Sequence, residues 1–170
     1  MKTPPFSLFA LLTLFVLTAV DAPARDLTTA EFRKFRGRYT GEVSGIAGNT
    51  TIPQQAIPSF ETAIVVTSKP VEMPTPMIRD LYSATKHRII WRKPTGTPNR
   101  AILIGIYSMR FTNSLGASIT ARGTRRIVIN DRGAAAPNRY IASFSDNLKE
   151  TFTLTGATSA AQDLKGTFQR

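Results

Sequence analysis

The chain carries few residues that could do chemistry, and most of its ionisable side chains are basic. Its 170 residues include 22 Lys and Arg, 11 Asp and Glu, one His and no Cys. A single histidine without any thiolate excludes a zinc or copper site built from those ligands. The sequence also lacks a G-x-S-x-G nucleophile elbow and a phosphate-binding glycine loop followed by Lys-Ser or Lys-Thr. We therefore predict neither a metal nor a cofactor.

Paired carboxylates are the one enzymatic route that the composition permits. Glycoside hydrolysis needs two acids held roughly 5 to 9.5 Å apart across a cleft. Glu42, Glu61 and Glu150 lie inside or beside segments with strand periodicity. A carboxylate-based hydrolase is thus one hypothesis, although such acids also offset neighbouring cations across strands.

Basic clusters give a stronger signal, because the formal net charge is +11. An excess of this size favours anionic partners, such as an acidic envelope polymer or lipid head groups. Nucleic acid is not expected, because the aromatic residues alternate like core residues and no RNA-recognition, KH or helix-turn-helix pattern is present. The candidate binding residues for an anionic partner are Arg33, Arg36, Arg88, Arg92, Arg125 and Arg126.

The N-terminal segment has the features of a secretory signal peptide. Met1-Lys2 is followed by an apolar run over residues 6–20 and by the triplet Ala22-Pro23-Ala24. A basic start, an apolar stretch shorter than a membrane span and an A-x-A motif are typical of a cleaved leader. We predict cleavage after Ala24 and a secreted or periplasmic protein. The absence of cysteine favours a bacterial envelope over an animal extracellular space.

The remaining residues, 25–170, form a single β-rich domain in this interpretation. A capping box over Thr28–Glu31 predicts a short N-terminal helix that ends near Gly37. From residue 38 onward the apolar residues recur with period two, and turn signals separate about eight strands. The fold class is therefore all-β with minor α: an antiparallel meander that forms a closed or partly open barrel or a curved sheet.

Five local expectations follow from the same patterns. Asp146-Asn147 predicts a tight turn between strands 139–145 and 148–154, and residues 117–124 and 125–130 are expected to form separate strands. A short helix or turn is expected over residues 77–82. His87 is expected at the rim of the core, and the interior is expected to be packed from Ile64, Val66, Ile89, Trp91, Ile102, Ile104, Ile106, Phe111, Ile127, Ile129, Phe144, Phe152 and Phe168.

The segment Phe35-Arg36-Gly37-Arg38-Tyr39 resembles the start of lipocalin-type barrels, which usually have tryptophan where Tyr39 stands. The resemblance covers five residues and implies a carrier of a small apolar ligand. The sequence therefore leaves three hypotheses open. The leading one is an exported, non-enzymatic β-domain that binds or supports something at the bacterial cell envelope; the others are the lipocalin-like carrier and the carboxylate-based hydrolase.

Overall fold

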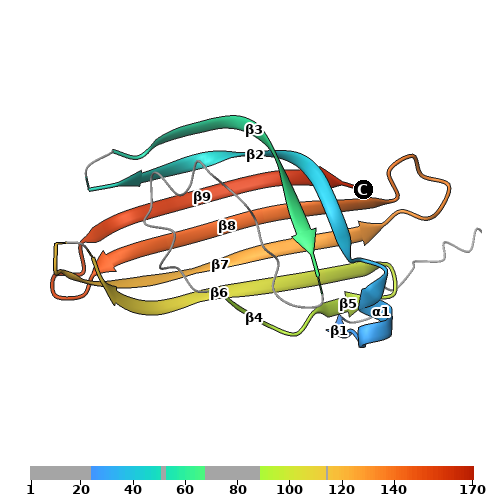
Figure 1. The fold of residues 1–170 in the computed structure, drawn as a ribbon, viewed down its shortest axis with the longest axis horizontal. Coiled ribbons are helices and arrows are strands. Elements are labelled where there is room, and N and C mark those ends of the chain that lie inside the picture. Colours follow the sequence, from blue (N-terminus) through green and yellow to red (C-terminus); the bar gives the residue numbers. More distant parts are fainter. Residues whose placement is uncertain (1–23, 51–52, 68–88, 114) are drawn as a thin grey trace, which may run out of the picture.

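A single antiparallel sheet of nine strands makes up most of the computed structural model, which describes residues 24–50, 53–67, 89–113 and 115–170. The strand order is β1-β5-β6-β7-β8-β9-β2-β3, and β4 also pairs with β6 (Figure 1). The elements are β1 (Arg25–Asp26), α1 (Thr29–Arg33), β2 (Gly37–Asn49), β3 (Gln55–Val66), β4 (Ile89–Trp91), β5 (Thr95–Thr97), β6 (Arg100–Thr112), β7 (Ser118–Asp131), β8 (Tyr140–Phe152) and β9 (Thr158–Gln169).

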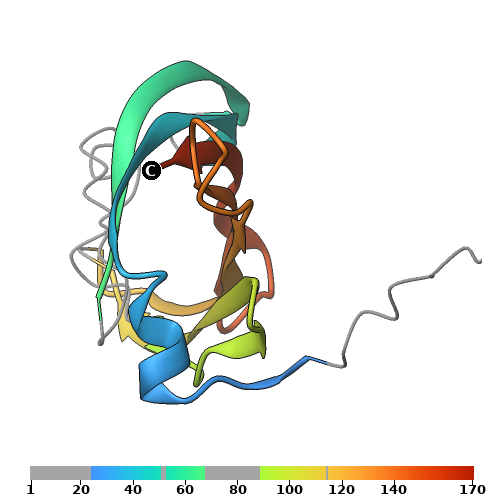
Figure 2. The same cartoon turned by 90° about the vertical axis from the view of Figure 1, so that its right-hand side faces the viewer.

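The sheet is strongly curved but is not closed into a barrel, so the closed-barrel alternative is wrong. Strands β2 and β3 sweep around the sheet, so that the ribbon encloses most of a ring when seen end-on (Figure 2). Gly41 of β2 permits this close wrapping, because a Cβ atom there would overlap the Thr167 carbonyl oxygen of β9. A register shift between Val43 and Gly45 in the β2–β3 pair adds a bulge, which increases local twist and bending.

The inner face of the sheet carries the hydrophobic core. Alternate residues of each long strand point inward, as the period-two pattern requires. This confirms six of the expected core residues as buried, while Ile89, Trp91 and Phe111 pack partly buried against them. The fully buried side chains include Phe35, Tyr39, Val43, Ile64, Ile127, Ile129, Leu164 and Phe168.

Strand β6 differs from the expectation, because its isoleucines do not face the core. Ala101, Leu103, Gly105 and Tyr107 are the buried residues of this strand. The residues between them, Ile102, Ile104 and Ile106, therefore point to the outer face and are only half-buried. Because β6 is apolar on both sides, its sequence does not indicate which side faces the core.

Strand β8 runs without interruption through Asp146 and Asn147, so the expected turn at these residues is wrong. They pair with Leu164 and Asp163 of β9 in the middle of the ladder. Strand β7 is likewise a single strand of 14 residues rather than two. The long strands of the sheet are therefore about twice as long as the turn signals indicated.

Helix α1 and the C-terminal residue close one end of the sheet. The Thr28 hydroxyl accepts from the Glu31 amide, and the Glu31 carboxylate accepts from the Thr28 amide. After the helix, the Arg170 guanidinium donates to the carbonyl oxygens of Lys34 and Arg36. These contacts satisfy backbone acceptors at the C-cap of α1 and in the segment between α1 and β2.

Several sequence expectations lie outside the described residues. They are residues 1–23 of the leader predicted over residues 1–24, the short helix or turn over residues 77–82, His87 and the candidate binding residue Arg88.

Candidate functional site

The outer face of β7, β8 and β9 carries a group of exposed cations, which we call the basic face: Arg122, Arg126, Lys149 and Lys165. Arg122 and Lys149 are direct cross-strand partners. Arg126 pairs with Ser145, which in turn pairs with Lys165. Each of the four side chains lies on the face opposite the core because its sequence neighbours point inward.

The basic face has little compensating negative charge. Asp163 is the one carboxylate on the outer side of β7, β8 and β9. None of the four cations lies within ion-pair distance of a carboxylate in the described part of the chain. Like charges directly opposite each other on a sheet destabilise it, so the Arg122–Lys149 pair costs folding energy.

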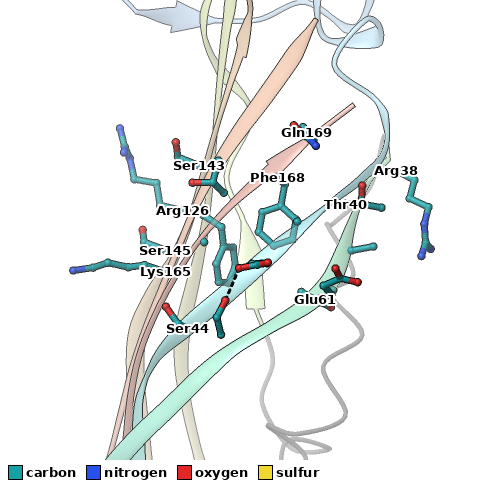
Figure 3. Close-up of a pocket in the computed structure, with 18 residues that line it drawn as sticks. Arg38, Thr40, Ser44, Glu61, Arg126, Ser143, Ser145, Lys165, Phe168 and Gln169 are labelled. Carbon is teal, nitrogen blue, oxygen red and sulfur yellow. Dashed lines mark hydrogen bonds between the residues drawn. The ribbon is translucent and has the colours of Figure 1, made fainter. Parts of the chain in front are cut away.

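Beside the basic face lies an open groove of about 1360 Å³. Arg126 and Lys165 project on one side of this region and Arg38 on the other, with Phe168 between them (Figure 3). Hydroxyl groups line much of the groove, and two carboxylates, Glu42 and Glu61, contribute negative charge. The lining residues come from β2, β3, β7, β8 and β9. Their uncharged polar side chains are Thr40, Ser44, Ser59, Thr62, Ser143, Ser145, Thr167 and Gln169.

Two of the three candidate catalytic acids meet in this groove. Glu42 and Glu61 are direct cross-strand partners, and both are exposed. The Ser59 hydroxyl donates to Glu42 Oε2 at 2.7 Å. Glu150 is buried on the inner face of β8 and therefore does not belong to this pair. The sequence could not show which acids lie together, because the Glu42–Glu61 pairing depends on the register between β2 and β3.

A second polar cluster lies inside the sheet, centred on Asp146. Its Oδ2 atom accepts from Arg125 Nη2 at 2.6 Å, from Gln162 Nε2 at 2.8 Å and from the Tyr107 hydroxyl at 3.2 Å. Arg125 also lies over the rings of Phe144 and Tyr107. Asp146 is completely buried, so this cluster holds β6, β7, β8 and β9 together from within.

Burial controls the protonation of this interior cluster. Desolvation raises the pKa of the Tyr107 hydroxyl, and the nearby Asp146 charge adds to the increase, against a lowering by Arg125. Burial lowers the pKa of the Arg125 guanidinium, but Asp146 and Tyr107 more than compensate, and the pKa is raised overall. Burial therefore disfavours ionisation of the Tyr107 hydroxyl, while the Arg125 guanidinium is held charged beside Asp146.

The structure describes five of the six sequence-predicted binding residues and places them in different parts of the fold. Arg33 is exposed on α1, and Arg36 is half-buried with its guanidinium over the Phe32 ring. Arg125 is 7% exposed and paired with Asp146, so it is not available to a surface partner. Arg92 and Arg126 share the outer face, where they lie on either side of Ile104.

Sequence reasoning missed Arg122, Lys149 and Lys165 as one group. They come from three strands, and only the register of β7, β8 and β9 brings them together. Their outward position could have been read from the alternation with buried neighbours, but their pairing could not.

No protein-family model, curated protein or solved structure matches the chain. Within the described ranges there is no group of three or more His, Cys, Asp or Glu that could hold a metal ion. None of the helical segments in that part of the chain is long and apolar enough to cross a membrane.

Proposed function

We propose that this protein is a non-enzymatic binding domain that docks on anionic polymers through its basic face. The export signal expected at the N-terminus would place this domain at the bacterial cell envelope, where acidic polymers and phosphate groups are abundant. The hydrolase and carrier hypotheses remain predictions from the sequence.

The observation that carries the proposal is the direct pairing of Arg122 with Lys149 on an exposed face. Two cations opposite each other gain stability when a polyanion lies across them, because the ligand replaces repulsion with attraction. Arg126 lies on β7 with Arg122, and Lys165 lies on β9, the strand next to that of Lys149. Both are on the same face and extend the positive surface toward the groove. A linear polyanion could therefore contact all four cations at once.

The experiment measures the affinity for a soluble polyanion, dextran sulfate, as a function of sodium chloride concentration. The test variant is Arg122→Gln/Lys149→Gln, and the matched control is Arg33→Gln/Arg132→Gln. Both double variants lower the formal net charge of +11 by two, and all four positions are exposed. The control therefore separates the basic face from the overall charge.

We expect affinity to fall steeply with salt, because binding releases counterions from the polymer. The test variant should bind about tenfold or more weakly and show a shallower salt dependence, whereas the control should change little. Equal losses in both variants would show that net charge, rather than this face, governs binding. Affinity that does not depend on salt would also overturn the proposal.

A further inference from the structure

Next to the basic face, the outer side of β4 and β6 carries four isoleucines, which we call the isoleucine stripe: Ile90, Ile102, Ile104 and Ile106. Ile90 and Ile106 are direct partners in the β4–β6 ladder. Ile90 is 56% exposed, and the other three are half-buried. Solvent-facing positions of an antiparallel sheet are usually polar, so a continuous apolar row on this side marks an interaction surface.

The isoleucine stripe and the basic face form one continuous surface. Ile104 pairs with Arg126 of β7. On its other side, the Arg92 amide donates to the Ile104 carbonyl at 2.9 Å and extends the β4–β6 ladder by one residue. Because Trp91 faces the core, Arg92 lies on the outer side with Ile90. Exposed cations thus border the apolar row on both sides.

We propose that this combined surface docks on a lipid bilayer that carries anionic phosphate head groups. The proposal rests on the polyanion-binding function proposed above and specifies its target. Isoleucine side chains can enter the boundary between head groups and acyl chains, while Arg92 and Arg126 contact the phosphates beside them. Apolar insertion and electrostatic attraction are then supplied by adjacent residues of one rigid sheet.

Charge complementarity favours a membrane over a second copy of the chain as the occupant. A symmetric dimer built on the isoleucine stripe would bring Arg92 and Arg126 of both copies into the same interface. Like charges brought together in this way repel each other and work against association. An anionic bilayer, by contrast, gains from the same cations and covers the same isoleucines.

The experiment compares binding to vesicles with binding to dextran sulfate for the same set of proteins. Vesicles contain phosphatidylcholine alone or with phosphatidylglycerol, and binding is measured by co-sedimentation. The test variants are Ile90→Thr and Ile90→Thr/Ile106→Thr. The matched control is Ile46→Thr, because Ile46 is 41% exposed on the outer side of β2, away from the isoleucine stripe. Circular dichroism and a melting curve verify that each variant is folded.

We expect the parent protein to bind vesicles that contain phosphatidylglycerol and not those of phosphatidylcholine alone. Ile90→Thr should weaken vesicle binding several-fold and the double variant roughly tenfold or more, since each isoleucine buries apolar area. Both should bind dextran sulfate as the parent does, and Ile46→Thr should match the parent in both assays. If the double variant does not fold, the several-fold loss of vesicle binding expected for Ile90→Thr decides the test.

Four outcomes would overturn the inference, and together they distinguish three explanations. Parent protein that binds dextran sulfate but not vesicles, or isoleucine variants that bind vesicles as well as the parent does, would reject the lipid target and leave polyanion binding intact. Failure to bind either probe would reject both proposals. A parent dimer that the isoleucine variants abolish, without vesicle binding, would assign the isoleucine stripe to a second copy of the chain.

Discussion

Arg125 and Asp146 form an ion pair inside the curved sheet, with Nη2 of the arginine 2.6 Å from Oδ2 of the aspartate. They are cross-strand partners on β7 and β8, and both point toward the core. Gln162 and Tyr107 donate to the same carboxylate oxygen. Removing water from two charges is costly, and the pair persists because each charge compensates the other.

Replacing Asp146 with alanine should therefore destabilise the protein by about 3–5 kcal/mol, because it leaves the Arg125 charge buried without a partner. Urea denaturation followed by circular dichroism measures the change. The control is Arg125→Met/Asp146→Leu, which removes both charges and keeps apolar volume. This double variant should be much closer to the parent in stability than Asp146→Ala is. A loss below about 1 kcal/mol for Asp146→Ala would show that Arg125 finds other compensation.

The same pair explains where sequence-based prediction succeeded and where it did not. The period-two pattern correctly indicated an antiparallel all-β sheet and a core that includes Ile127, Phe144 and Phe168. Asp146-Asn147 has the composition of a turn, and only the partners supplied by β7 and β9 keep the aspartate inside a strand. Those partners are distant in sequence, so local propensity could not reveal them.

The candidate site shows the same limit of sequence information. Arg92 and Arg126 were both predicted to bind an anionic partner, and the structure places them on either side of Ile104. Arg125 was predicted with them, yet it directly precedes Arg126 on β7, so its side chain points to the face opposite that of Arg126. The prediction identified the cations of this segment but not the face to which each belongs. Alternation separates Arg125 from Arg126, but which of the two points inward depends on the strands that pair with β7.

Asp131 gives the stability a dependence on pH. Its carboxylate accepts from Arg139, from the Lys34 ammonium at 3.0 Å and from the Gly133 amide. Hydrogen bonds from Arg139 are the largest cause of a pKa well below the usual range, with Lys34 and Gly133 adding to the decrease against desolvation. The folded state thus favours the charged form. Its contribution is complete above the unfolded pKa of about 3.9 and is lost as the pH falls below that value.

We expect the difference in unfolding free energy between the parent and Asp131→Asn to be largest at pH 6 and to shrink steadily between pH 4 and pH 2. Urea denaturation at each pH measures it, and the difference cancels most contributions from other carboxylates. Glu31, whose pKa is lowered to about 2 chiefly by Arg25 and also by Thr28, titrates equally in both proteins. A difference that stays constant across this range would show that Asp131 does not act through its charge.

Gly41 should be intolerant of any side chain. A Cβ atom at this position would overlap backbone atoms of Thr167 and Phe168, which cannot move without separating β2 from β9. We expect Gly41→Ala to destabilise the protein by about 1–3 kcal/mol or more. Gly105→Ala is the control, because a Cβ atom there would first meet the side chains of Ile89 and Trp91 and not the backbone of a neighbouring strand. Equal losses in thermal denaturation would contradict a special role for the β2–β9 contact.

Arg170 should stabilise the end of the sheet where α1 docks. Its guanidinium lies 4.3 Å from the Tyr140 ring centroid and 5.2 Å from that of Tyr39, and it donates to the carbonyl oxygens of Lys34 and Arg36. The interactions are local, so we expect Arg170→Met to expose α1 to transient opening without unfolding the sheet. Hydrogen exchange followed by mass spectrometry should show faster exchange in residues 32–39 and unchanged exchange in β7 and β8. Arg170→Lys restores the charge but lacks the planar fork that reaches two carbonyl groups, so it should protect α1 only in part. Full protection by lysine would show that charge alone, rather than the paired hydrogen bonds, holds this end.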